Sequence, residues 1–485
     1  MELSAEQRGC DITRREREKT RSCHSGMGVL HRPLNARREP RRRYGKERTL
    51  MQHDAYDEEE FWSRDQIEAT QLARLKNVVA RVYKGCEFYR KRLDEAGVTP
   101  DSIKTLDDIE KIPMTSKDDL RSQYPLGLVI VPRNQLVRLH CSSGTTGTPV
   151  AIAHTQNDLN VWADLMARCL HMVGVRKDDV FQNMSGYGLF TGGLGIHAGA
   201  ERLGCMTIPA GPGNTLRQIK LVRDFHTTVA HILPSYALIL GERLREMGED
   251  PRKLPLRIAV VGAEPYTEGF RRRIEELFDI KVYNSYGLSE MNGPSVGFEC
   301  LEQNGLHIWE DAYLAEIVDP ETGKHVKPGE IGELVMTTLK REGMPILRYR
   351  TRDLTRFLPG ECACGRHHRR MDRIVGRCDD MFICKGVNMY PQQIEQVIMQ
   401  FKEVGKNYVI QLDSDGLGDV LRVKVEIRDE YFVDDMRVLQ GLQQRIARRL
   451  RDEILVTPKV ELCQSNSLPV KDGKAVRFVD LRNKK

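Results

Sequence analysis

The sequence predicts an α/β fold: a large N-terminal domain with mostly parallel sheets flanked by helices plus a small β subdomain, and a small α+β C-terminal domain. Three patterns predict it. Strand-like and helical runs alternate between residues 206 and 286, short strands separated by turns follow Glu310, and a last βαβ-like unit begins at Gly376. With 40% hydrophobic residues among 485, the chain has enough apolar material for these cores.

Residues 1–50 are expected to form a disordered basic extension, because they show no hydrophobic periodicity. They carry 14 Lys/Arg and 7 Asp/Glu, whereas the other 435 residues are nearly neutral, with 61 and 62. A basic tether, a targeting peptide and a plain upstream extension are the alternatives. Composition favours the plain extension, since seven acidic residues argue against a transit peptide. The neutral body does not indicate nucleic-acid binding.

The large domain is expected to span residues 51–375. Its first part, from about 60 to 124, is amphipathic and indicates helices. A short strand (Leu136–His140) leads into a Gly/Thr/Ser loop, and a helix (Asn157–Val173) follows. The alternating region then predicts parallel α/β units, with elements at Met206–Ala210, Leu216–Phe225, Val229–Leu233, Ala237–Met247, Ile258–Gly262, Gly269–Phe278 and Lys281–Tyr286.

After Glu310 the turns PETG, KPGE and REGMP separate short strands, which favours antiparallel β structure. These strands are expected at Ala312–Val318, Gly332–Thr337 and Asp353–Phe357. The small domain, residues 376–485, is expected to contain a helix at Pro391–Gln400 and strands at Asn407–Gln411 and Leu421–Ile427.

The longest uncharged stretch, residues 180–200, is long enough to span a bilayer. Six glycines and the polar residues Gln182, Asn183, Ser185 and His197 argue against that. We therefore interpret the stretch as a Gly-rich pocket wall in a cytoplasmic protein. The twelve cysteines are scattered and the chain shows no signal peptide, which fits a reducing compartment.

The loop after the first strand has the composition of a phosphate-binding loop. Glycines let the backbone approach a phosphate closely, while hydroxyl and amide groups supply hydrogen-bond donors. The loop lacks the Gly-Lys-Ser/Thr ending of a P-loop, and taken alone it would also fit a surface turn. Its residues are Ser142, Ser143, Gly144, Thr145, Thr146 and Gly147.

Further motifs follow this loop along the chain. They are YGLSE (286–290), YRTRD (349–353), GRCDD (376–380), PQQIE (391–395) and LPVKDGK (468–474). In this order and spacing the set resembles the adenylate-forming superfamily of acyl-CoA synthetases, adenylation domains and luciferases. Longer stretches, among them SGYGLFTGGLGIHAGAERLG and MDRIVGRCDDMFICKGVNMYPQQIEQV, are similar to the phenylacetate–CoA ligase family.

The resemblance implies ATP-driven activation of an aryl acid, phenylacetate first among them, as an acyl-adenylate that then acylates coenzyme A. It also implies that the small domain rotates about a hinge at Asp379 between the two half-reactions. Lys474 is the expected catalytic residue, because a cation there would neutralise the α-phosphate and the attacking carboxylate. Glu290 matches the acidic residue that contacts Mg²⁺.

The resemblance assigns the other nucleotide contacts by position. The phosphate loop matches the triphosphate loop, although Val150 stands where many relatives carry lysine. Tyr286 would stack on the purine, and Ser289 would bond the α-phosphate. Asp353 would accept from both ribose hydroxyls, with Arg377 near the same ribose or phosphate. Adenine contacts match Gly262, Ala263, Glu264 and Pro265.

The acid pocket is expected within the Gly-rich stretch. Glycines beside aromatic residues suit a flat aryl group slotted against the backbone, although ordinary Gly-rich packing is the alternative. The family places pocket residues at Tyr187, Gly188, Phe190, Thr191 and Gly192.

Four further residues could form a metal site. The pair Cys362-x-Cys364, with Cys300 and His307 upstream, would give a closed tetrahedral Cys₃His set and hence structural zinc. The spacing matches no standard zinc pattern. The neighbouring histidines His367 and His368 are rival ligands, and four unrelated thiols and imidazoles are the alternative.

Three functions are weighed. The first is an aryl-acid–CoA ligase; the second is an adenylating enzyme for another aromatic acid, or one whose acceptor is a carrier protein or a redox cofactor; the third is a non-catalytic module. Retention of Glu290, Asp353, Arg377 and Lys474 argues against the third. The expected partners are the acid, ATP, Mg²⁺ and coenzyme A, with no nucleic acid and no membrane; a homodimer is left open.

Overall fold

The computed structural model describes residues 55–142, 149–264, 266–385, 387–414, 419–432, 435–471, 474–475 and 477–482. The expected extension, residues 1–50, lies outside the described residues. Among the described helices, none combines the length and the apolar character that a membrane span requires. The ten cysteines in this part of the chain are free thiols.

The N-terminal region is helical, as expected, and its helix starts are set by capping residues. The first long helix, α1 (Arg64–Gly85), begins after Ser63, whose side chain accepts a hydrogen bond from the Gln66 amide while the Gln66 side chain accepts from the Ser63 amide. Two shorter helices follow: α2 (Glu87–Glu95) and α3 (Lys117–Ser122).

A mixed sheet lies at the centre of the large domain. Its strand order is β13-β9-β8-β7-β6-β5-β3-β4. The pairings from β4 to β7 are parallel, as predicted, whereas those from β7 to β13 are antiparallel and were not predicted. The strands are β3 (Val180–Asn183), β4 (Met206–Ile208), β5 (Val229–His231), β6 (Ile258–Gly262), β7 (Lys281–Leu288), β8 (Gly293–Glu299), β9 (Leu306–Ile308) and β13 (Arg370–Met371).

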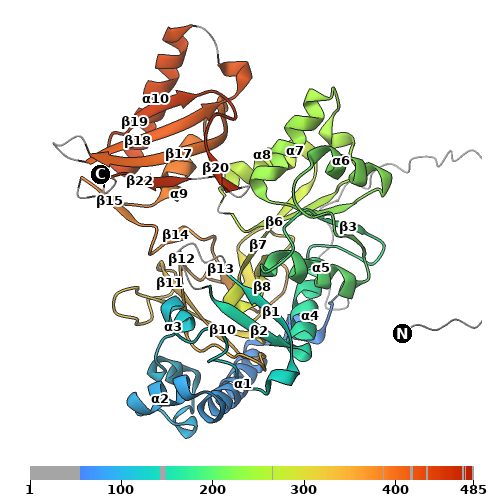
Figure 1. The fold of residues 1–485 in the computed structure, drawn as a ribbon, viewed down its shortest axis with the longest axis vertical. Helices are drawn as coiled ribbons and strands as arrows, with labels where there is room; N and C mark the ends of the chain where they lie inside the picture. The colour runs from blue at the N-terminus through green and yellow to red at the C-terminus, as the bar shows by residue number, and fades with distance from the viewer. Residues whose placement is uncertain are drawn as a thin grey trace, which may run out of the picture. The chain divides into compact units, whose positions relative to one another are not determined.

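Helices cover both faces of the parallel half (Figure 1). Alternate strand residues therefore enter two apolar cores: Val260 packs in the core that includes α4 and α5, and Val261 packs in the core that includes α6, α7 and α8. The helices are α4 (Gln156–Met172), α5 (Thr191–Leu203), α6 (Thr215–Asp224), α7 (Pro234–Glu246) and α8 (Glu268–Phe278).

Helix α5 was not predicted, because glycine is a poor helix former. Two of its glycines are explained by close packing against α4, and Gly193 by its close approach to the Gly186 backbone. A Cβ on Gly195 would lie 2.1 Å from the Trp162 ring, and a Cβ on Gly199 would lie 2.4 Å from Met166. The Gly-rich stretch thus provides a strand and a helix that approaches its neighbour closely, with the segment 184–190 between them.

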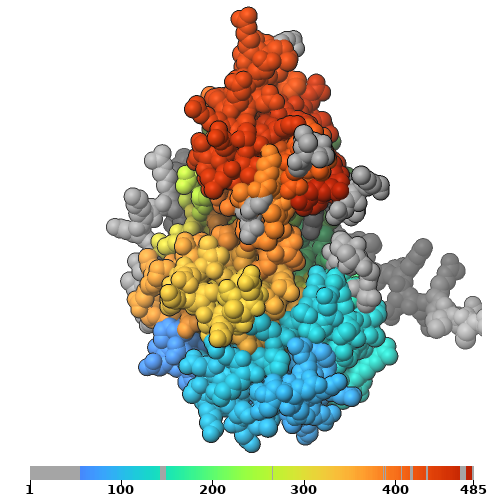
Figure 2. Space-filling model, turned by 90° about the vertical axis from the view of Figure 1, so that its left-hand side faces the viewer, coloured from blue at the N-terminus to red at the C-terminus, as the bar shows by residue number. Residues whose placement is uncertain are grey.

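The β subdomain is an antiparallel sheet of order β10-β11-β12-β14, as expected. It packs against the N-terminal helical region, and the two lie side by side in Figure 2. Thr115 forms a bridge with Tyr349, and Arg348 donates to the Ile112 carbonyl oxygen at 2.9 Å. The strands are β10 (Tyr313–Val318), β11 (Gly332–Thr338), β12 (Tyr349–Thr355) and β14 (Gly376–Arg377); β1 (Leu136–Cys141) and β2 (Ala151–Thr155) form a separate hairpin-like pair.

The C-terminal region is α+β. A four-stranded sheet of order β19-β18-β17-β22 carries the helices α9 (Pro391–Ile398) and α10 (Met436–Ile454). The expected boundary at residue 376 stays a prediction; β14, just after it, pairs with β12 of the β subdomain. The strands are β15 (Phe382–Cys384), β16 (Val387–Met389), β17 (Val404–Ser414), β18 (Asp419–Ile427), β19 (Lys459–Cys463), β20 (Val470–Lys471), β21 (Lys474–Ala475) and β22 (Phe478–Asp480).

Deleting residues 1–50 is expected to leave the melting temperature and turnover unchanged, whereas deleting residues 1–62 should destabilise the protein. The longer cut removes Glu60, which pairs with the buried guanidinium group of Arg366, and Asp57, which shares the guanidinium group of Arg168 with Asp311. An unpaired buried charge costs about 3–5 kcal/mol. Thermal unfolding of both truncated proteins tests this. A melting temperature below that of the full chain after deletion of residues 1–50 would contradict the prediction.

Candidate active site

Two residues from separate motifs bind the carboxylate of a third residue, Asp353. Asp353 lies in β12, opposite Arg377 of β14, and Tyr286 comes from β7. The Tyr286 hydroxyl donates to Oδ2 of Asp353 at 2.5 Å, and Nη1 of Arg377 donates to Oδ1 at 2.8 Å. The structure therefore brings together the three residues expected around the adenosine.

Burial dominates the electrostatics of this group. It raises the pKa of the Asp353 carboxyl, while Arg377 acts in the opposite direction. Burial and the nearby Asp353 carboxylate raise the pKa of Tyr286 well above its ordinary value, so the hydroxyl keeps its proton and donates. Arg377 also grips the expected hinge residue, since its Nε and Nη2 donate to the two oxygens of Asp379 at 2.9 and 3.0 Å.

The YGLSE motif ends in a short 3₁₀ turn, η7 (Ser289–Met291). The carboxylate of Glu290 is buried and accepts at one oxygen from the Tyr349 hydroxyl, at 3.1 Å. Its backbone carbonyl accepts from Arg341 at 2.6 Å. The hydroxyls of Ser289 and Thr191 are 3.2 Å apart and hydrogen-bonded, which joins this motif to the expected acid pocket.

The expected adenine contacts lie at the carboxyl end of β6, the edge at which parallel sheets bind ligands. Gly262 pairs with Ser285 of β7 so closely that a Cβ would lie 2.3 Å from the Ser285 carbonyl oxygen. Ala263 has a φ of +64°, and Glu264 accepts from the Ser235 hydroxyl at 3.0 Å.

Part of the expected site lies outside the described residues. This holds for Ser143, Gly144, Thr145, Thr146, Gly147 and Pro265. The backbone of Lys474 forms β21, but its side chain is not described. At the base of the phosphate loop, the Ser142 amide donates to the Val150 carbonyl at 3.0 Å, and Val150 itself is fully buried.

The expected acid segment, residues 187–192, lies after β3 and includes the first two residues of α5. A polar network holds Tyr187: Asn183 donates to its hydroxyl at 2.9 Å, and Nδ1 of His197 lies 3.2 Å from the same oxygen. His231 donates to Asn183 at 3.0 Å; burial lowers its pKa to about 4 and keeps the ring neutral.

The backbone of the acid segment faces open space at two of its glycines. A Cβ on Gly188 or on Gly192 would have no atom within 4 Å among the described residues. The side chain of Phe190 is 51% exposed. A side chain added at Gly188 or Gly192 would therefore meet no described atom.

Sequence reasoning missed Asn183 and His231 as supports of the site. Both are the last residues of parallel strands, β3 and β5. A polar residue at the carboxyl end of a buried strand was the available signal, because ligand sites of α/β sheets lie at that edge.

Comparisons with known proteins agree with this arrangement. A family model described as AMP-binding enzyme matches residues 71–339, and one described as AMP-binding enzyme C-terminal domain matches residues 386–482. A phenylacetate–coenzyme A ligase of Thermus thermophilus is 46% identical over 86% of this chain and 97% of its own length; one of Escherichia coli is 43% identical over 90% and 99%. The chain belongs to the phenylacetate–CoA ligase family of AMP-binding enzymes.

Solved structures of a related ligase share this fold. A 2-hydroxyisobutyryl-CoA ligase in its postadenylation state, with 2-HIB-AMP, superposes with a TM-score of 0.82, at 30% identity over 87% of this chain and 91% of that one. The same ligase in its thioesterification state gives only 0.65, over 88% and 92%.

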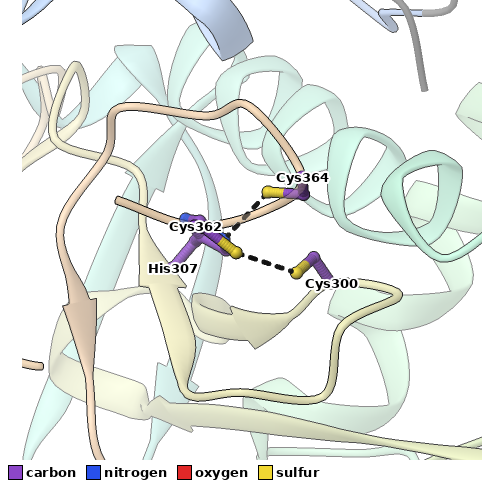
Figure 3. A group of neighbouring side chains, drawn as sticks. All are labelled: Cys300, His307, Cys362 and Cys364. Atoms are coloured by element: carbon purple, nitrogen blue, oxygen red, sulfur yellow. Dashed lines mark hydrogen bonds between the residues drawn. The ribbon is translucent and has the colours of Figure 1, made fainter. Parts of the chain in front are cut away.

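A second cluster lies apart from the nucleotide residues. Cys300 follows β8, His307 lies in β9, and Cys362 and Cys364 lie in the loop before β13. Their sulfur and ring nitrogen atoms all lie within 4.8 Å of one another, all four residues are buried, and Figure 3 shows the side chains pointing toward one another. The pairing of β13 with β9 brings the loop onto His307.

The rival ligand His368 is occupied elsewhere. Its Nδ1 accepts from the Glu310 amide at 3.1 Å, and its Nε2 donates to the Glu59 carbonyl at 2.9 Å. Its own carbonyl accepts from Nδ1 of His307 at 3.2 Å, which leaves Nε2 of His307 facing Cys364 at 3.4 Å. A backbone partner that orients a ligand histidine in this way is typical of metal sites.

A crevice of about 490 Å³ lies between α7–α8 and the small domain. Charged side chains line most of it, among them Arg273 and Arg428. None of the expected site residues lines this crevice, so we do not assign it to the acid or to the nucleotide.

Proposed function

We propose that this protein is an ATP-dependent acid–CoA ligase that activates phenylacetate or a close aryl acid, with release of AMP and pyrophosphate. The observation that carries the proposal is the similarity to phenylacetate–CoA ligases, which extends over nearly their whole length. The geometry supports it, because the contact between Thr191 and Ser289 puts the acid segment beside the nucleotide motif.

In the first half-reaction a carboxylate oxygen of the acid attacks the α-phosphorus, and the bond to the β-phosphate oxygen breaks to release pyrophosphate. Asp353 would exchange its present partners, Tyr286 and Arg377, for ribose hydroxyls or share its oxygens with them. Lys474 would place its ammonium between the phosphate and the carboxylate. Catalysis is then mostly positioning and charge stabilisation.

A bound Mg²⁺ would neutralise phosphate charge. Glu290 fits this role, because it offers a hard carboxylate oxygen and the Tyr349 hydroxyl engages only one of its two oxygens among the described residues. Burial of Glu290 between Tyr349 and the Arg341 contact fixes the direction of the carboxylate.

In the second half-reaction the thiol sulfur of coenzyme A attacks the acyl carbon, and AMP leaves. We propose that the small domain rotates about Asp379 between the two steps. Arg377 would link this rotation to the nucleotide. Its guanidinium group binds both Asp353, the expected ligand of the ribose hydroxyls, and Asp379, the expected hinge residue. Release of Asp379 would free the hinge while Arg377 stays on Asp353.

A panel of acids tests the substrate class. We expect the kcat/KM for phenylacetate to exceed that for octanoate at least about tenfold, because a misplaced methylene costs roughly 1–3 kcal/mol in a fitted slot. Benzoate should be slower, since its carboxylate would stop short of the α-phosphate. Replacing Gly192 with valine places a side chain in open space and should impair aryl acids first.

The same panel should include 2-hydroxyisobutyrate, since a ligase of that name is the structural neighbour described above. Pyrophosphate release measured with and without coenzyme A separates an acid–CoA ligase from an enzyme with a carrier protein or redox cofactor as acceptor. If octanoate or acetate were the better substrate, the aryl assignment would fail while the adenylation chemistry would stand.

We also propose that Cys300, His307, Cys362 and Cys364 hold one structural zinc ion. Tetrahedral bonds of about 2.3 Å from zinc place two sulfurs about 3.8 Å apart, and the Cys300 and Cys362 sulfurs lie 3.7 Å apart. Three thiolates would leave the site with a net negative charge. Arg366 would balance it, since its pKa is raised by Glu60 and Cys364 against the effect of burial, and its buried Nη1 has no hydrogen-bond partner among the described residues.

A further inference from the structure

Two hydrogen bonds tie the acid segment to the strand that precedes the phosphate loop. The Leu189 carbonyl oxygen accepts from the Cys141 amide at 2.9 Å and lies 3.1 Å from Nδ1 of His140. Ser142, the next residue, closes the base of the phosphate loop on Val150. The last two residues of β1 and the residue that follows them therefore fix both the acid segment and the start of the loop.

The His140 ring is directed at Leu189 by its surroundings. The ring is 1% exposed and packs edge-on against the rings of His154 and Trp162, with centroids 5.7 and 5.6 Å away. Burial lowers the pKa of His140, so the ring is neutral, and Nδ1 must carry the proton because its partner is a carbonyl. Its Nε2 is buried without a partner among the described residues.

A hydrogen bond also joins the C-terminal part of the acid segment to a nucleotide motif. Thr191 bonds Ser289 of YGLSE, two residues beyond the Leu189 carbonyl. The intervening side chains of Leu189 and Phe190 stay 61% and 51% exposed. The backbone of the segment is thus held at two points while its side chains remain available for a ligand.

We propose that His140 is a positioning residue that couples acid binding to ATP binding through the Leu189 carbonyl. This rests on the proposed function, in which residues 187–192 bind the acid and residues 142–147 bind the triphosphate. The link runs through described residues: a substrate that fixes the position of the Leu189 carbonyl also fixes His140 and Cys141, which directly precede Ser142 at the base of the loop, and the second substrate then binds an arranged site. The coupling is reciprocal, so each substrate raises the affinity for the other by the same factor.

The test compares His140→Phe with the wild type. The affinity for α,β-methylene-ATP, from which pyrophosphate cannot leave, is measured with and without phenylacetate. Phenylacetate should tighten nucleotide binding in the wild type, and the variant should lose a measurable part of that coupling, because it retains only the Cys141 bond to the Leu189 carbonyl. The KM for phenylacetate should rise roughly three- to tenfold, with kcat at saturating substrates nearly unchanged.

Two further variants separate positioning from packing. His140→Asn retains an N–H donor and should restore most of the coupling. His154→Phe alters the same ring cluster, but both nitrogens of His154 are buried without partners among the described residues, so the coupling should be unaffected.

The outcomes are distinguishable from failure of the proposed function. Equal coupling and equal phenylacetate KM in His140→Phe and His154→Phe would overturn the inference, and so would a wild type that turns over phenylacetate but shows no coupling. A wild type that turns over no aryl acid would instead count against the proposed function.

Discussion

Replacing Lys474 with alanine is expected to slow adenylate formation at least about 100-fold and to leave thioester formation from a supplied acyl-adenylate nearly unchanged. The reason is that charge develops on the α-phosphate and the attacking carboxylate only in the first half-reaction. Exchange of labelled pyrophosphate into ATP measures that step, and coenzyme A consumption from synthetic phenylacetyl-adenylate measures the second.

A matched control lies in the same two-stranded element. Lys471 of β20 pairs in register with Lys474 of β21, so Lys471→Ala removes the same charge from the same hairpin. It should cost far less in the first half-reaction, since only Lys474 matches the family motif. Equal losses in both half-reactions for Lys474→Ala, or equal effects of the two substitutions, would remove the assignment.

Periodicity and motif order predicted the elements that carry the nucleotide residues. The end of β6 at Gly262 and the strand after it are where alternation placed them. The antiparallel half of the sheet was missed, because β9 is short and fully buried and β8 is buried except at Pro294, so neither strand shows alternation. Helix α5 was missed because Gly195 and Gly199 permit contacts with α4, which sequence propensity does not contain.

The candidate site was predicted from the resemblance of its motifs to a family and not from its hydrogen bonds. The sequence indicated Asp353 and Arg377 as ligands of one nucleotide, but it could not show that Arg377 also holds Asp379. Likewise Leu189 acts through its carbonyl oxygen, which every residue possesses. Contacts made by backbone atoms leave no signature in residue identity, so only the fold reveals them.

Cys364→Ser is expected to remove about one zinc ion per chain and to lower the melting temperature by about 5–10 °C, because binding at a closed structural site contributes directly to folding stability. Turnover per folded molecule should change little, since the four ligands lie apart from Asp353 and Glu290. Elemental analysis of protein purified in metal-free buffer, together with thermal unfolding, checks both parts.

The loss should exceed that of an ordinary buried thiol, and Cys205→Ser is the matched control. Cys205 is also buried, its sulfur donates to the Arg176 carbonyl at 3.3 Å, and a serine hydroxyl can replace that bond. X-ray absorption should show three sulfurs at about 2.3 Å and one nitrogen around the zinc. Protein without zinc, or a Cys364→Ser variant as stable as Cys205→Ser, would show that the four side chains form a buried thiol–imidazole cluster and not a metal site. The 3.7 Å between the Cys300 and Cys362 sulfurs argues against a disulfide as the alternative, because a disulfide needs about 2.05 Å.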